Sequence, residues 1–208
     1  MTEGSGVLPD LVWFLDHLGL AVFAISGALA AAEKRLDILG FVLFATITGV
    51  GGGTLRDLLL DTDIFWIASP NYIWVCICAA ALTWFFAGRF DSLRVPLLWV
   101  DALGMALFAV LGTQKALQFE VPTIVAVGMG MMTASFGSLI RDTLLKRTVV
   151  LLEPDIYVTA ALLGAVCYVA LDRLNFSEDI SLWVSVFAAF SLRAAAMLFS
   201  LRLPKYHA

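Results

Sequence analysis

Charged residues are scarce in this chain of 208 residues, and that scarcity excludes a water-soluble fold. They make up 14% of the sequence, against 61% hydrophobic residues and a mean hydropathy of +0.93. A soluble domain has about 25% charged residues, whereas each charge at bilayer depth costs several kcal/mol. The net charge of -4 also leaves no basic surface for nucleic acid. We therefore expect an integral membrane protein with no nucleic-acid partner.

Cysteines and catalytic motifs are also sparse. The three cysteines, Cys76, Cys78 and Cys167, lie inside apolar runs, and their spacing fits neither a disulfide framework nor a zinc site. The two histidines have no second ligand at metal spacing. The chain contains no GxSxG, HExxH, P-loop or GxGxxG pattern. The sequence thus predicts no enzyme activity, no cofactor and no resident metal ion.

Long apolar runs dominate the sequence. A transmembrane helix needs about 20 mostly apolar residues, and charged or proline-marked breaks divide the chain into seven such runs. They cover roughly 11–32, 38–60, 70–88, 96–116, 121–145, 156–173 and 181–201. The connections are short. We expect an all-α fold with seven transmembrane helices in a single membrane domain over residues 1–208.

The chain repeats itself at an offset of 85 residues. Residues 15–60 align without a gap on residues 100–145, with fifteen identities in forty-six positions. The matched pairs include Asp16 with Asp101, Thr48 with Thr133, Gly52 with Gly137, Arg56 with Arg141, and Asp57 with Asp142. Three spans separate each residue from its partner, so the second copy must cross the membrane in the opposite direction. We predict a three-plus-three inverted repeat, about 11–90 and 96–175, followed by a seventh helix at about 181–201.

The basic residues predict the orientation of this bundle. In short loops, lysine and arginine favour the cytoplasmic side. One side holds only Lys115 and Arg173, and the other holds Lys34, Arg35, Arg89, Arg94, Lys146, Arg147, Arg202 and Lys205. The sequence therefore predicts a multi-pass protein of the bacterial inner membrane, with its N-terminus outside and its C-terminus in the cytoplasm.

Glycines interrupt the second span, and a weaker version of the same pattern interrupts the fifth. The residues concerned are Gly49, Gly51, Gly52, Gly53 and Thr54 in the second span, and Ser135, Phe136, Gly137 and Ser138 in the fifth. Glycine raises the entropic cost of a helix, and broken helices at matching positions of two repeats are typical of a transport site. The glycines could instead permit close helix contact. Three adjacent glycines cover most of the helix circumference, which favours a kink or an unwound segment.

An arginine and an aspartate follow each glycine region. Arg56 and Asp57, and likewise Arg141 and Asp142, should face the protein interior, because a charge facing lipid is costly. Adjacent residues on a helix point about 100° apart, which favours partners on other spans, with Asp16 and Asp101 as candidates. Our hypothesis is two polar clusters flanking a central path. Alternatively, these charges lock the helices together and meet no permeant ion.

These features together resemble the prokaryotic branch of the trimeric intracellular cation (TRIC) channel family. The resemblance covers nearly the whole chain and includes the sequence from Gly51 to Asp57, echoed by that from Gly137 to Asp142. It implies a homotrimer in the lipid bilayer, with one potassium-selective pore in each protomer. The family's pore lies between the kinked second and fifth helices, here at Gly51, Gly52, Gly53, Gly137 and Ser138. Phe136 stands where the first copy has Gly51 and could narrow that pore.

Two functions remain open from the sequence. The first is a passive channel for monovalent cations, chiefly potassium, in which helix-break carbonyls and hydroxyls replace part of the hydration shell. The second is a secondary transporter of a small zwitterionic solute such as an amino acid, because broken helices also present amide groups to carboxylates. Unitary currents would identify the first function, and saturable uptake without them would identify the second.

Overall fold

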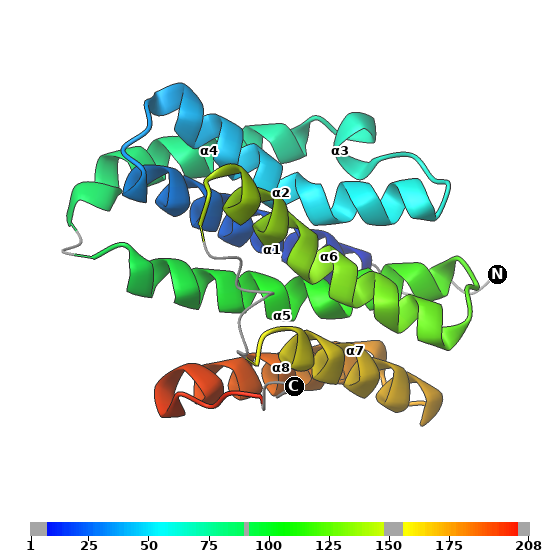
Figure 1. The fold of residues 1–208 in the computed structure, drawn as a ribbon. Helices are drawn as coiled ribbons and strands as arrows, with labels where there is room; N and C mark the ends of the chain where they lie inside the picture. The colour runs from blue at the N-terminus through cyan, green and yellow to red at the C-terminus, as the bar shows by residue number, and fades with distance from the viewer. Residues whose placement is uncertain (1–7, 90–91, 148–155, 204–208) are drawn as a thin grey trace, which may run out of the picture.

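The computed structural model describes residues 8–89, 92–147 and 156–203, and the regular elements within these ranges are helices. Seven of the helices are long (Figure 1). In chain order the elements are α1 (Leu8–Glu33), α2 (Ile38–Leu59), α3 (Phe65–Ala68), α4 (Asn71–Phe86), the short 3-10 helix η1 (Ala87–Arg89), α5 (Arg94–Gln118), α6 (Thr123–Leu144), α7 (Val158–Arg173) and α8 (Glu178–Phe199).

The seven long helices confirm the predicted all-α membrane fold. Each predicted run corresponds to one of them, and the boundaries differ by a few residues. Six of the seven are long and apolar enough to cross a membrane. One of the six is α4 counted together with η1, as the 19 residues Asn71–Arg89. The exception is α7, whose 16 residues fall short of the roughly 20 that span a bilayer. Of the basic residues used to predict orientation, Lys205 lies outside the described ranges.

The four-residue helix α3 was not predicted. Two polar side chains near the end of α2 hold it in place: the backbone N–H of Phe65 donates to Asp57 Oδ2 at 3.0 Å, and Trp66 Nε1 donates to Thr54 Oγ1 at 2.9 Å. Such an element depends on contacts across the turn rather than on an apolar period of its own. The hydropathy pattern therefore gave no indication of it.

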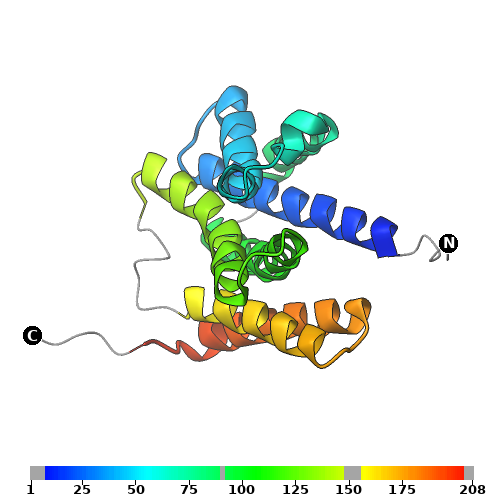
Figure 2. The ribbon, with the colours of Figure 1, turned by 90° about the vertical axis from the view of Figure 1, so that its right-hand side faces the viewer.

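The two halves of the bundle run in opposite directions. In Figure 1, α1 runs from the end marked N towards the left, whereas its repeat partner α5 runs from left to right; α2 and α6 are opposed in the same way. The first half consists of α1, α2 and α4, and the second of α5, α6 and α7. The last helix, α8, packs beside α7 at the edge of the bundle (Figure 2). The inverted arrangement predicted from the repeat is thus present.

Reciprocal contacts join α1 to α5. A methyl group at Gly19 would lie 3.3 Å from the ring of Phe108, and one at Gly104 would lie 2.8 Å from the ring of Phe23. The rings of Phe23 and Phe108 stack with their centroids 5.4 Å apart. Gly19 and Gly104 are repeat partners, as are the two phenylalanines. Each contact is therefore made twice, as expected around a two-fold axis.

The same reciprocity brings α2 and α6 into direct backbone contact. A methyl group at Gly52 would lie 2.0 Å from the carbonyl oxygen of Thr133, and one at Gly137 would lie 2.2 Å from that of Thr48. Gly51 also faces the backbone of Gly137. No larger side chain fits at Gly52 or Gly137 without moving a helix. The two glycines are needed for the close approach rather than for backbone flexibility.

Of the two predicted forms of the glycine region, a kink or an unwound segment, the unwound segment is wrong, because α2 and α6 are each helical throughout. The glycines of α2 do point in several directions, as the sequence suggested, but each direction meets a close neighbour. Gly49 faces Cys76 of α4, Gly52 faces α6, and Gly53 faces the ring of Phe65 in α3. An unpaired backbone group in hydrocarbon costs several kcal/mol, so packing glycines on all sides of an intact helix is the more stable arrangement.

A single added methyl group should distinguish contact glycines from free ones. We expect Gly137→Ala to lower the free energy of unfolding by about 2 kcal/mol, the usual cost of overpacking. Gly128→Ala, on the same helix, is the matched control, because no heavy atom of the described residues lies within 4 Å of the added methyl group. Thermal unfolding of both purified variants in detergent tests this. Equal unfolding midpoints would contradict the close contact at Gly137.

Candidate functional site

Two groups of buried charge lie at the C-terminal ends of α2 and α6. Because these helices run in opposite directions, the groups occupy opposite ends of the bundle (Figure 1). Arg56 is 4% exposed and Arg141 is fully buried. We call them the first-repeat cluster (Arg56, Asp57, Lys115) and the second-repeat cluster (Ser26, Asp101, Arg141, Asp142).

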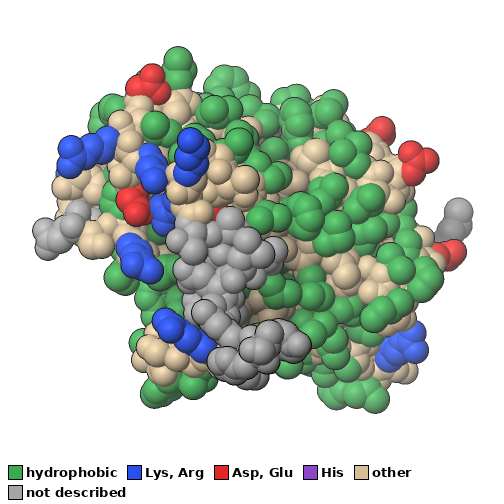
Figure 3. Space-filling model, viewed as in Figure 1, with side chains coloured by type: hydrophobic (Ala, Val, Ile, Leu, Met, Phe, Trp, Pro, Cys, Tyr) green, Lys and Arg blue, Asp and Glu red, His purple; other side chains and the backbone are tan. Residues whose placement is uncertain are grey.

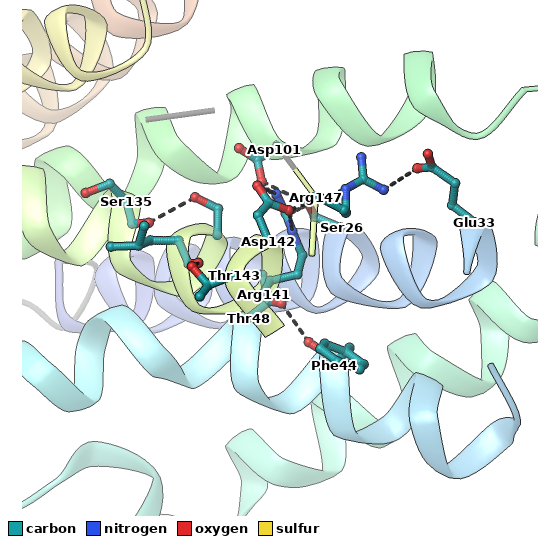
Figure 4. Close-up of polar contacts among 12 residues, drawn as sticks. Ser26, Glu33, Phe44, Thr48, Asp101, Ser135, Arg141, Asp142, Thr143 and Arg147 are labelled. Carbon is teal, nitrogen blue, oxygen red and sulfur yellow. Dashed lines mark hydrogen bonds and ion pairs between the residues drawn. The ribbon is translucent and has the colours of Figure 1, made fainter. Parts of the chain in front are cut away.

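In the second-repeat cluster, one arginine joins three helices (Figure 4). Arg141 Nη1 donates to Asp101 Oδ1 of α5 at 2.7 Å and to Ser26 Oγ of α1 at 2.5 Å. Its Nε and Nη2 donate to the two carboxylate oxygens of Asp142 at 2.8 and 3.0 Å. Ser26 also donates to Asp101 Oδ1 at 3.0 Å. The buried guanidinium therefore has a partner on each of its nitrogens.

A second arginine balances the charge of this cluster. Arg141 alone faces two carboxylates, but Arg147 Nε lies 3.6 Å from Asp142 Oδ1. Arg147 also pairs with Glu33 at the end of α1 (Figure 4). Breaking a buried ion pair by removing one partner typically costs about 3–5 kcal/mol. The cluster thus fixes the ends of α1 and α6 against α5.

In the first-repeat cluster, the carboxylate of Asp57 is the common acceptor. It receives Arg56 Nε at 2.8 Å and Lys115 Nζ at 2.9 Å on Oδ1, and the backbone N–H of Phe65 at 3.0 Å on Oδ2. Asp57 itself is fully buried. One carboxylate therefore links α2, α3 and α5, in the way that Arg141 links α1, α5 and α6.

A cavity of about 270 Å³ adjoins the first-repeat cluster. Asp16 lines it and accepts a hydrogen bond from the hydroxyl of Tyr72 at 2.7 Å. The cavity wall has cationic, anionic and amide groups among apolar ones; it is formed by Val12, Trp13, Asp16, Arg56, Phe65, Tyr72, Leu111, Gln114, Lys115 and Gln118. The space therefore suits a hydrated cation or a small solute that has charges of both signs.

Two substitutions between the repeats explain why the clusters differ. Ser26, which bonds both charges of the second-repeat cluster, corresponds to Leu111 in the other half, and Lys115 corresponds to Ala30. The lysine supplies Asp57 with a second cation. The second-repeat cluster is thus a closed network of hydrogen bonds, while the first-repeat cluster borders open space.

The predicted pairing of the arginines is partly right. Arg141 pairs with Asp101 across helices, as expected, but each arginine also pairs with the aspartate that follows it, which the sequence analysis disfavoured. An arginine side chain is long enough to fold back over the 100° between neighbours. Asp16 pairs with Tyr72 instead of an arginine, because Lys115 occupies the remaining side of the first-repeat cluster.

Hydroxyl groups surround the crossing of α2 and α6. Thr48 donates to Phe44 O at 2.6 Å and Thr133 donates to Met129 O at 2.7 Å, and both residues are 1% exposed. The other predicted hydroxyl residues also donate to helix carbonyls: Thr54 to Val50, Ser135 to Met131, and Ser138 to Ser135. A hydroxyl whose hydrogen is used in this way has only lone pairs left to offer. These oxygens can therefore accept from a donor or coordinate a cation.

Two residues of these clusters could not be recognised from the apolar pattern of the sequence alone. Lys115 lies inside α5 and not in the connection that the apolar runs predict for it. Ser26 is a lone serine in an apolar run, which has no distinguishing pattern. Phe136, predicted to line a pore, is half-buried on α6. Comparing the polarity of repeat partners would have found Lys115 and Ser26, since both replace an apolar partner.

A family model described as "Glycine transporter" matches the chain twice, over residues 13–88 and 98–173. The two matches are offset by the same 85 residues as the sequence repeat. Among curated proteins, the chain is 35% identical over 199 residues to a UPF0126 membrane protein of Vibrio cholerae, covering 95% of this chain and 83% of that protein. It is 34% identical over 201 residues to the UPF0126 inner membrane protein YadS of Escherichia coli (strain K12), covering 94% and 96%.

Among solved structures, the fold is similar to that of the TRIC channel orthologue from Rhodobacter sphaeroides. The TM-score is 0.89 and the sequence identity 45%, covering 92% of this chain and 99% of the other. Fold, repeat and sequence therefore agree. The chain belongs to the prokaryotic branch of the TRIC channel family, which also includes the UPF0126 membrane proteins.

Proposed function

We propose that this protein is a potassium-selective cation channel, a homotrimer in which each chain has its own pore between α2 and α6. The solved structures that this chain resembles are those of TRIC cation channels, which supports conduction of a cation. Potassium selectivity, the position of the pore and the trimer are parts of the proposal.

The reciprocal crossing of α2 and α6 is the observation on which this proposal rests. At that crossing, Gly52 lies against the carbonyl of Thr133 and Gly137 against that of Thr48. Backbone carbonyls together with the hydroxyls of the same threonines can replace part of a potassium hydration shell. Because the two helices are in contact, conduction requires them to separate. The glycines then leave a passage lined by oxygen atoms rather than by bulky side chains.

The buried arginines do not oppose this path, because carboxylates compensate them. Arg141 faces Asp101 and Asp142, and Arg56 faces Asp57. A neutralised pair repels a nearby cation far less than an isolated guanidinium would. The two clusters then lie at the two ends of the path, one bordering the cavity and the other closing the opposite end.

We further propose that the N-terminus faces outside the inner membrane. The exposed basic side chains on one face gather mainly at the end where α1 finishes, and several acidic ones lie at the opposite end (Figure 3). Basic residues favour the cytoplasmic side. The Escherichia coli relative YadS is an inner membrane protein, which supports the proposal that this chain lies in the inner membrane.

Removing the threonine hydroxyls should reduce conduction while leaving the fold intact. We expect Thr48→Val and Thr133→Val each to reduce the unitary potassium conductance severalfold, because an apolar methyl group replaces an oxygen at the crossing. Planar-bilayer recording in asymmetric potassium and sodium measures both conductance and selectivity. Thr143→Val is the matched control, since Thr143 makes the same type of bond, to Leu139 O, but is exposed.

The outcomes separate the parts of the proposal. Absence of unitary currents in the unmodified protein would reject a channel. Currents that are unchanged in both variants would reject a pore between α2 and α6 while leaving a channel elsewhere in the chain.

A transporter of a small zwitterion is the second candidate, and the cavity next to Arg56 favours it. Arg56 and Lys115 can attract a carboxylate, and Asp16 can attract an ammonium group, on walls of the same 270 Å³ space. A free α-amino acid has both groups. The description of the matching family model is consistent with such a substrate.

Glycine counterflow into proteoliposomes tests this second function. A transporter should show saturable uptake that Arg56→Gln abolishes, because the substrate carboxylate loses its guanidinium partner. A channel should show no accelerated exchange of glycine. Lys34→Gln, which removes an exposed charge at the opposite end of the chain's first helix, is the control. Uptake that is lost equally in both variants would indicate damage to the protein rather than to the cavity.

A further inference from the structure

A second, wider groove lies at the basic end of the bundle, where α1 ends and α2 begins beside η1. Its volume is about 590 Å³, and its walls are Ala32, Arg35, Leu36, Phe41, Trp84, Ala87, Gly88 and Leu93. Neither charge cluster contributes to it. We propose that this groove binds an anionic phospholipid from the membrane, with the phosphate at Arg35 and an acyl chain against Trp84.

No carboxylate among residues 8–89, 92–147 and 156–203 forms an ion pair with the cation in this groove. The side chain of Arg35 is exposed and makes no hydrogen bond or ion pair with any residue in the described ranges, and only its backbone N–H is used, donating to Ala32 O at 2.9 Å. The acidic residues on either side of it are already occupied: Asp37 accepts from Gly40 N at 2.8 Å as the N-cap of α2, and Glu33 pairs with Arg147. Arg35 is therefore available to a phosphate group.

Two further arginines flank the same opening. Arg89 directly follows Gly88, and its guanidinium lies 4.6 Å from the centre of the Phe86 ring. Arg94 follows Leu93 at the start of α5. Near an anionic membrane surface, each basic residue contributes about 1 kcal/mol of attraction. The charge around the opening thus complements a headgroup with a net negative charge.

The remainder of the groove is apolar. Trp84 packs edge-on against Phe41, with ring centroids 4.8 Å apart, and is 42% exposed. Exposed apolar side chains continue on both neighbouring helices, with Leu39 and Phe85 each 73% exposed. A tryptophan at the junction of polar and apolar surface is typical of the membrane interface. The groove therefore offers a phosphate contact at one end and a surface for an acyl chain beyond it.

The inverted repeat provides a natural comparison. A related groove of about 370 Å³ lies at the other end of the bundle, lined by Gln114, Leu117, Gln118, Tyr168, Asp172, Phe176 and Glu178. Asp172 and Glu178 occupy the positions that Ala87 and Leu93 occupy in the basic groove. Two carboxylates repel a phosphate, so we expect the anionic lipid to bind at the basic end alone.

Titration with defined lipids tests the headgroup contact. Native mass spectrometry of the purified protein should show tighter binding of phosphatidylglycerol than of phosphatidylcholine. Arg35→Gln should weaken phosphatidylglycerol binding about fivefold. The matched control is Lys34→Gln, because Lys34 is the adjacent exposed cation and does not line the groove. Equal weakening by the two variants, or equal binding of the two lipids, would overturn the proposal.

The acyl-chain contact needs a separate measurement. Phosphatidylglycerol brominated on its acyl chains should quench the fluorescence of Trp84. The Trp84→Phe variant should therefore show less quenching than the unmodified protein, although the lipid is still bound. If Trp84→Cys instead forms a disulfide between two copies in the membrane, a second subunit covers the groove and the lipid site is wrong. Neither readout depends on ion conduction, so both remain valid if the proposed channel function fails.

Discussion

Gly52 and Gly137 bring the backbones of α2 and α6 together, each against a threonine carbonyl of the other helix, and the positions of the other helices follow from this crossing. In hydrocarbon, apolar side chains gain little by leaving lipid, so close backbone packing supplies much of the attraction between helices. The repeat makes this contact between α2 and α6 twice. Gly19 and Gly104 do the same for α1 and α5 through Phe108 and Phe23, which places all four central helices around one axis.

Buried charge extends this arrangement to the ends of the helices. Arg141 has hydrogen-bond partners on α1, α5 and its own helix, and Asp57 has partners on α2, α3 and α5. An incompletely paired charge at this depth would be costly. Each network therefore determines where its helices meet, and the residues that complete it are as important as the arginines. The central crossing and the two end networks together keep the bundle in one arrangement.

Much of the fold was predictable from the sequence, because hydrocarbon imposes a simple length rule on apolar runs and because Arg56 and Arg141 recur at one offset. The helix count, the inverted repeat and the pairing of Arg141 with Asp101 follow from those two facts. The unwound segment predicted for α2, by contrast, is absent from the structure. Glycine content alone cannot distinguish a flexible helix from a closely packed one, since the difference lies in neighbours such as Thr133 and Phe65 that are distant in sequence. For the same reason the roles of Ser26 and Lys115 became visible only once α1, α5 and α6 were placed together.

The exchange of Ala30 for Lys115 between the repeats has one more consequence. Two identical halves in opposite orientation would give a path whose two entrances are equivalent, and such a path conducts equally well in either direction. Along the path proposed between α2 and α6, the end at the first-repeat cluster has a lysine, a cavity and an aspartate bonded to tyrosine, while the other end has a closed network built on Ser26. A path between them is therefore electrically asymmetric. A current through the proposed path should therefore rectify, and the difference between Ala30 and Lys115 would be its simplest structural origin.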